Sequence, residues 1–121
     1  MIPKNCHLWL KKNITADDIN FIPVKDYWEY SHDWRFLAKC SDCGQLYVSD
    51  SVETIDWING NDKISTTIVP VSEEELKEND YSKISQLELL AFSPIILWNP
   101  DNKLKWIRIN PLSHGQDELM I

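Results

Sequence analysis

Hydrophobic and polar residues alternate along the middle of this chain in the two-residue repeat that is typical of β-strands. Residues 34–40 show it first, and the repeat sets Arg35 on the opposite face from the tryptophan and the phenylalanine beside it. Residues 45–50 predict the partner strand of a hairpin, because Gly44 can adopt the positive φ that closes a tight turn. Residues 63–71 are rich in β-branched side chains and predict a further strand.

Weaker strand patterns lie on both sides of this region. Residues 2–12 mix hydrophobic and polar positions with the spacing of a strand, and residues 22–33 predict an ordered loop or an irregular strand. Strand spacing also continues through Trp57, as far as the Asn-Gly-Asn-Asp turn that follows it. Residues 95–98 and 104–109 flank an Asn-Pro-Asp-Asn turn and predict a last hairpin.

Helix signals are concentrated after the strand at residues 63–71. Ser72 and Glu75 form a capping box that predicts a helix start. We expect this helix to break near Asp80, which then caps a second helix, although alternation leaves a strand over residues 86–92 as the alternative. Four hydrophobic residues share one face of that second helix: Tyr81, Ile84, Leu87 and Ala91. The sequence therefore predicts one α+β domain over residues 1–121, mostly antiparallel sheet with one or two helices.

Composition narrows the class of protein. The 121 residues include 12 basic and 19 acidic side chains, for a net charge of −7, which argues against a nucleic-acid-binding face. No run of apolar residues approaches the length that spans a bilayer, and the N-terminus lacks the features of a signal peptide. We therefore expect a cytoplasmic protein without a membrane partner, and three cysteines there do not predict a disulfide framework.

Cys40 and Cys43 form a Cys-x-x-Cys motif between two predicted strands, and three interpretations stay open. The first is a zinc site, which needs four ligands. Four other side chains are candidate partners: Cys6, His7, His32 and His114. Neighbours on a strand point to opposite faces, so we expect at most one of Cys6 and His7 to be well placed. The second is a redox pair, which a helix N-terminus would favour. The third is a tight turn with two semi-buried thiols and no cofactor.

The sequence shows no arrangement typical of an active site. The three histidines are far apart, and none lies in a motif with a nucleophile and an orienting carboxylate. Three glycines cannot make a phosphate-binding loop. We therefore expect a protein without catalytic activity.

The segment from Trp34 to Tyr47 resembles a pattern in small bacterial immunity proteins that accompany polymorphic toxins, including those of contact-dependent growth inhibition. The pattern is an aromatic-led strand that enters a Cys-x-x-Cys-Gly-Gln turn, with an aromatic residue two positions after the glutamine. The resemblance covers about 14 residues and implies a non-catalytic inhibitor that binds one cognate toxin in the cytoplasm. Many such toxins are basic nucleases, which implies an acidic partner surface.

We expect that surface at two places in the sequence. Nine residues are the candidates, namely an exposed tryptophan anchor and the acids near it in sequence or on the predicted helix: Glu53, Asp56, Trp57, Asp62, Glu73, Glu74, Glu75, Glu78 and Asp80. Tryptophan is enriched among the residues that dominate binding energy, whereas the acids would steer a basic partner. The other interpretation of Glu73, Glu74 and Glu75 is that they are solvent-exposed residues that only stabilise the start of the helix.

Overall fold

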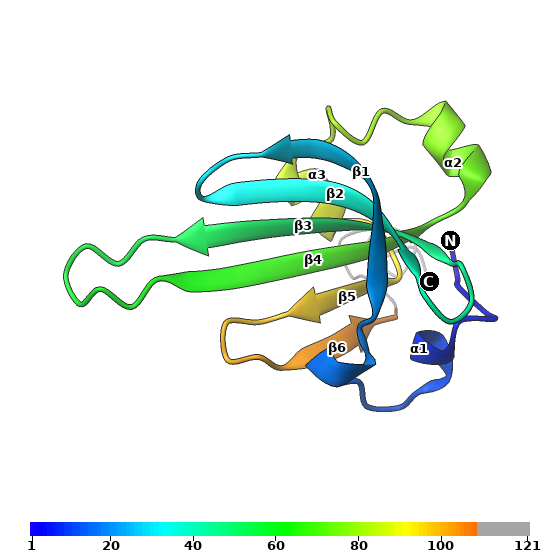
Figure 1. The fold of residues 1–121 in the computed structure, drawn as a ribbon, viewed down its shortest axis with the longest axis horizontal. Helices are drawn as coiled ribbons and strands as arrows, with labels where there is room; N and C mark the ends of the chain where they lie inside the picture. Colours follow the sequence, from blue (N-terminus) through cyan, green and yellow to red (C-terminus); the bar gives the residue numbers. More distant parts are fainter. Residues whose placement is uncertain (109–121) are drawn as a thin grey trace, which may run out of the picture.

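Six strands form one antiparallel sheet in the computed structural model, which describes residues 1–108 (Figure 1). They pair in the order of the sequence: β1 (Phe21–Glu29), β2 (Asp33–Cys40), β3 (Leu46–Thr54), β4 (Lys63–Val71), β5 (Ile95–Trp98) and β6 (Leu104–Ile107). The helical segments are α1 (His7–Leu10), the 3-10 turn η1 (Ala16–Asp18), α2 (Glu73–Glu78) and α3 (Gln86–Leu90). The α+β prediction is confirmed, with three short α-helices in the described residues where one or two were expected.

Because consecutive strands are antiparallel neighbours, the turns between them lie at the two ends of the sheet. The turns at residues 30–32, 55–62 and 99–103 lie together at what we call the hairpin end, on the left of Figure 1. The Cys-x-x-Cys turn at residues 41–45 lies at the opposite end, which we call the cysteine end. The N-terminus reaches this second end too, because its ammonium group pairs with Glu75 of α2.

Each face of the sheet is covered in part, by a different segment. The N-terminal segment covers one face with Leu8 and Ile14, in a cluster with Tyr47, Ile68 and Ile96. The connection between β4 and β5 covers the other face, in a cluster that includes Val48, Val69, Tyr81, Leu89 and Ile95. Adjacent residues of one strand belong to opposite clusters, which explains why β4 is β-branched on both sides.

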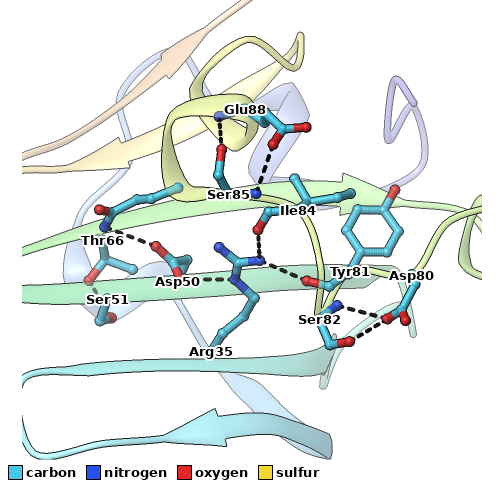
Figure 2. A network of polar contacts seen from close by, with 11 residues as sticks. Arg35, Asp50, Ser51, Thr66, Asp80, Tyr81, Ser82, Ile84, Ser85 and Glu88 are labelled. Carbon is cyan, nitrogen blue, oxygen red and sulfur yellow. Dashed lines mark hydrogen bonds and ion pairs between the residues drawn. The ribbon is translucent and has the colours of Figure 1, made fainter.

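A buried ion pair fastens the second covering segment to the sheet (Figure 2). Arg35 of β2 donates from Nε to Oδ1 of Asp50 on β3 at 2.9 Å. Its Nη1 donates to the backbone carbonyl oxygens of Tyr81, at 2.7 Å, and Ile84. The guanidinium carbon lies 4.2 Å from the centre of the Trp28 ring, and Gln86 donates to the second oxygen of Asp50 at 3.1 Å. The irregular backbone between α2 and α3 thus gains two of its hydrogen bonds from one sheet side chain.

The strand prediction for residues 2–12 is wrong. These residues form a turn and the single helical turn α1, which begins directly after Cys6. The backbone carbonyl of Leu8 accepts a hydrogen bond from the indole N–H of Trp106 at 2.8 Å. In a strand, this carbonyl would instead accept from the backbone of a neighbouring strand. Burial of Leu8 against the sheet therefore outweighs the local alternation.

Two further boundaries differ from the prediction. The second helix starts at Gln86, because Ser85 and Glu88 form their own capping box, so the alternative strand over residues 86–92 is also wrong. Asp80 instead accepts from the backbone and the hydroxyl of Ser82 in the preceding turn. β3 ends at Thr54, so Trp57 lies in a loop.

The other elements match the predictions closely. The central hairpin, with Gly44 at φ 78°, and the helix start at Ser72 are as expected. β4 covers the predicted residues 63–71, and the last hairpin forms. β1 is the irregular strand that was one of two options, with register shifts at Pro23/Lys25 and Asp26/Trp28.

Candidate functional site

The loop between β3 and β4 is shaped by two of its own carboxylates. Oδ1 of Asp56 accepts hydrogen bonds from the backbone N–H groups of Ile58, at 3.1 Å, and Asn59, at 3.0 Å. The backbone N–H of Asp56 donates to Oδ1 of Asp62 at 2.8 Å. Gly60 completes the turn with a φ of 69°, a conformation that side-chain-bearing residues rarely adopt. Both acids thus act on the loop itself, in addition to placing charge at the hairpin end.

The charge of Asp56 is stabilised by these contacts. Hydrogen bonds from the backbone of Asn59 and Ile58 lower the pKa of its carboxyl group, while partial desolvation acts in the opposite direction. N–H groups that point at a carboxylate favour its ionised form. The hairpin end therefore keeps this negative charge at physiological pH.

The tip of this loop exposes two large hydrophobic side chains. Trp57 is 90% exposed and Ile58 is 92% exposed, although the backbone beside them is fixed by hydrogen bonds. Neither side chain contributes to either core cluster. Adjacent, exposed apolar side chains without a role in the core are typical of a contact surface for a partner.

A hollow of about 540 Å³ lies next to this loop, and we call it the aromatic hollow. Its walls include Trp34 and Phe36 of β2, Ile64 of β4 and Trp98 of β5, with Asp62 and Lys63 beside them. These strand residues belong to the face that the N-terminal segment covers nearer the cysteine end. The covering segment stops short of the hairpin end, so the hollow combines aromatic surface with the acidic loop.

The structure divides the predicted partner-binding residues into two groups. Glu53, Asp56, Trp57 and Asp62 lie at the hairpin end, where Glu53 also pairs with His32 at 2.8 Å. Glu73, Glu74, Glu75, Glu78 and Asp80 follow β4 at the cysteine end. The nine residues of β4 separate the groups by about 30 Å, at roughly 3.3 Å per residue. A single small contact patch cannot include both groups.

The acids near α2 also differ in their roles. Glu75 accepts from the backbone of Ser72 at 3.1 Å and pairs with the N-terminal ammonium group at 3.5 Å, so it stabilises the fold. Hydrogen bonds from the hydroxyl and the backbone of Ser82 lower the pKa of the Asp80 carboxyl group. Glu73, Glu74 and Glu78 are exposed on α2, as the interpretation of solvated helix residues also expects.

Three cysteines meet at the cysteine end. The sulfur atoms of Cys6, Cys40 and Cys43 lie within 4.8 Å of one another, with Cys6 and Cys40 buried and Cys43 exposed. Nδ1 of His7 lies 3.8 Å from the Cys40 sulfur and 3.6 Å from Oδ2 of Asp42. The expectation that at most one of Cys6 and His7 is well placed assumed a strand, whereas these residues start a helix. Both side chains therefore approach Cys40, Cys6 in the group of three sulfurs and His7 in a second group with Asp42.

Burial controls the chemistry of this cluster. Desolvation raises the pKa of the Cys6 thiol to about 11, although the nearby Tyr47 hydroxyl and the backbone of Leu8 act in the opposite direction. The Tyr47 hydroxyl is buried beside the Cys6 sulfur and makes no well-formed hydrogen bond among the described residues. Desolvation is also the main reason that the pKa of Tyr47 is raised. Reasoning from the sequence missed Tyr47, since no local motif marks a buried tyrosine as part of such a group.

Of the two remaining candidate ligands, the one within the described residues lies away from the cluster. His32 lies in the turn between β1 and β2, at the hairpin end. His114 lies outside the described residues. Of the four proposed partners of the Cys-x-x-Cys motif, the structure therefore brings Cys6 and His7 to it.

Comparison with known proteins assigns neither a family nor a function to this chain. No protein-family model, curated protein or solved structure matches this chain. The resemblance to immunity proteins over residues 34–47 therefore stays a prediction. Within residues 1–108, no helix has the length and apolar character needed to cross a membrane.

Proposed function

We propose that this chain is a non-catalytic immunity protein that binds a cognate toxin domain through its hairpin end. The observation that carries the proposal is the tip of the β3–β4 loop, where Trp57 and Ile58 are almost fully exposed on a hydrogen-bonded scaffold. Because hydrogen bonds already hold the backbone of the tip, binding would cost little backbone freedom there. The tip would bind as the central anchor of the contact.

Charge defines the chemistry of the partner. The chain carries a net charge of −7, and Asp56 and Asp62 lie directly beside the apolar tip. A basic protein surface is complementary to this arrangement, and lysine or arginine side chains suit a hollow that combines indole rings with a carboxylate. A basic toxin domain is therefore the partner that we propose.

The resemblance over residues 34–47 supports the same function and also implies a cellular location. Immunity proteins of this kind protect the cell that makes them, so the proposed location is the cytoplasm, and neither nucleic acid nor a membrane is a proposed partner. Inhibition follows from occlusion, since a bound hairpin end would cover the basic surface of the toxin. No catalytic group of this chain takes part.

The first prediction concerns the kinetics of this complex, measured by surface plasmon resonance with the toxin domain encoded next to the gene for this chain. Trp57→Ala is expected to weaken binding by at least about 30-fold, or about 2 kcal/mol, mainly through faster dissociation. Raising the salt concentration is expected to slow association, because screening weakens long-range steering. Leu10→Ala, which truncates another exposed hydrophobic side chain on α1, is the control and is expected to have no effect.

Two isosteric substitutions locate the contact. Glu53→Gln keeps the hydrogen bond from His32 but removes the charge at the hairpin end, whereas Glu74→Gln removes one at the cysteine end. Only Glu53→Gln is expected to slow association beyond the general effect of net charge. Absence of a complex with the toxin domain would refute the proposed function, and equal effects of Trp57→Ala and Leu10→Ala would refute the proposed surface.

A further inference from the structure

We propose that Cys6, His7, Cys40 and Cys43 bind one Zn²⁺ ion in a tetrahedral site at the cysteine end. The inference is independent of toxin binding, since the proposed binding surface lies at the other end of the sheet. It develops the zinc interpretation of the Cys-x-x-Cys motif, for which the sequence supplied two ligands. The structure supplies the other two from the start of α1, where Cys6 is the N-cap and His7 the first helical residue.

The distances among the three sulfurs suit zinc, and His7 approaches one of them. With Zn–S bonds of about 2.3 Å and Zn–N bonds of about 2.0–2.1 Å, a tetrahedral angle sets two sulfurs about 3.8 Å apart and a nitrogen about 3.6 Å from a sulfur. The three sulfurs are within 4.8 Å of one another, and Nδ1 of His7 lies 3.8 Å from the Cys40 sulfur, in a second group with Cys40 and Asp42. Binding of one ion by all four residues therefore requires the His7 ring to rotate away from Asp42 and toward the sulfurs of Cys6 and Cys43.

The kind of site follows from the number and type of the donors. Three thiolates and one imidazole complete a four-coordinate shell, which leaves no open position for a substrate. Soft sulfur ligands favour zinc over calcium or magnesium, which prefer oxygen. Cys43 is exposed and His7 is partly exposed, so an ion can enter from solvent, while Cys6 and Cys40 form the buried side.

The Tyr47 hydroxyl is the independent observation that points to an ion. Tyr47 is fully buried, and its hydroxyl faces the Cys6 sulfur without a formed hydrogen bond. A buried hydroxyl without a partner is costly, and such groups are uncommon in folded proteins. A zinc-bound thiolate at Cys6 would be a strong acceptor for this hydroxyl, and outer hydrogen bonds of this kind are typical of metal sites.

The role of the ion would be to hold the N-terminal segment on the sheet. α1 has only four residues, too few to be stable as an isolated helix. Cys6 and His7 are separated from Cys40 by more than 30 positions in the sequence, so coordination would close a long loop. The segment that covers one face of the sheet would thereby be fixed at the cysteine end.

The test uses the full chain, purified with a reductant that does not bind metal. Elemental analysis is expected to find about one zinc per chain. After zinc is removed, addition of Co²⁺ is expected to produce the thiolate-to-cobalt charge-transfer band and the intense visible bands of tetrahedral coordination. A fully reduced chain that gives no such spectrum and carries no zinc would overturn the proposal.

Three variants assign the ligands. Cys43→Ser changes an exposed side chain and is expected to bind Co²⁺ far more weakly than the wild type. Its melting temperature is expected to be lower than that of the zinc-bound wild type, and the two are expected to be equal once a chelator has removed the metal. His7→Gln is expected to weaken Co²⁺ binding, whereas Asp42→Asn, beside it, is expected to change nothing. The reverse result for this pair would overturn the proposed ligand set.

Tyr47→Phe tests the outer hydrogen bond. The substitution keeps the ring that stacks on Phe21 at 4.9 Å, so the fold is expected to survive. The affinity for Co²⁺ is expected to fall about 10-fold to 100-fold, as is typical when an outer partner of a metal ligand is removed. Unchanged affinity in a folded variant would exclude this role for the hydroxyl.

Discussion

Replacing Arg35 by methionine is expected to lower the free energy of unfolding by about 3–5 kcal/mol, because it leaves a buried carboxylate without its cation. Arg35 is 1% exposed and Asp50 is 2% exposed, so water cannot replace the lost contact. The substitution also removes the donor to the carbonyls of Tyr81 and Ile84. A loss of this size is a large fraction of the stability of an ordinary domain.

A second variant separates the charge from the hydrogen bonds. Arg35→Met combined with Asp50→Leu removes both charges and is expected to be more stable than Arg35→Met alone. The double variant is still expected to be less stable than the wild type. Two backbone carbonyls lack a donor in it, at a cost of about 1–3 kcal/mol each. Urea unfolding followed by circular dichroism measures all three proteins. A single variant as stable as the wild type would show that the ion pair does not hold the β4–β5 connection.

Replacing Leu89 by alanine is expected to lower the free energy of unfolding by about 2–5 kcal/mol. Leu89 is 0% exposed and packs in the cluster with Val48, Val69 and Ile95. The five residues of α3 cannot form a stable helix alone, so the contact with the sheet determines whether α3 forms. Thermal and urea unfolding of the purified variant provide the measurement.

Leu87→Ala is the matched control for this experiment. The same substitution is made two residues earlier on the same helix, where the side chain is 73% exposed. Its expected effect is within about 0.5 kcal/mol, the range of ordinary surface substitutions. Equal losses in the two variants would mean that α3 does not face the sheet as the structure shows.

The predicted elements that hold are those with a local physical cause. The central hairpin requires a residue that tolerates positive φ, and Gly44 provides it. The helix start at Ser72 depends on two hydrogen bonds within four residues. The strand over residues 63–71 follows from β-branched side chains buried on both faces.

The missed elements depend on contacts between distant residues. Alternation set Arg35 on the same face as Leu37, but its burial requires Asp50 and the backbone near residues 81–84, which no local pattern connects. Leu87 was expected on the buried face, but packing against Val48, Val69 and Ile95 buries Leu89 in its place. The start of α3 at Ser85 is the exception among the missed features, because its capping box is a local signal.

The same division applies to the two candidate sites. The sequence by itself determined that Cys40 and Cys43 share a turn and that acids surround Trp57. Only the tertiary structure decided that Cys6, His7 and Tyr47 join the cysteines and that the acids of α2 lie at the opposite end from Trp57. The physical reason is that turns and caps are set by energies within a few residues. The position of a covering segment is set by burial against strands that lie far away along the chain.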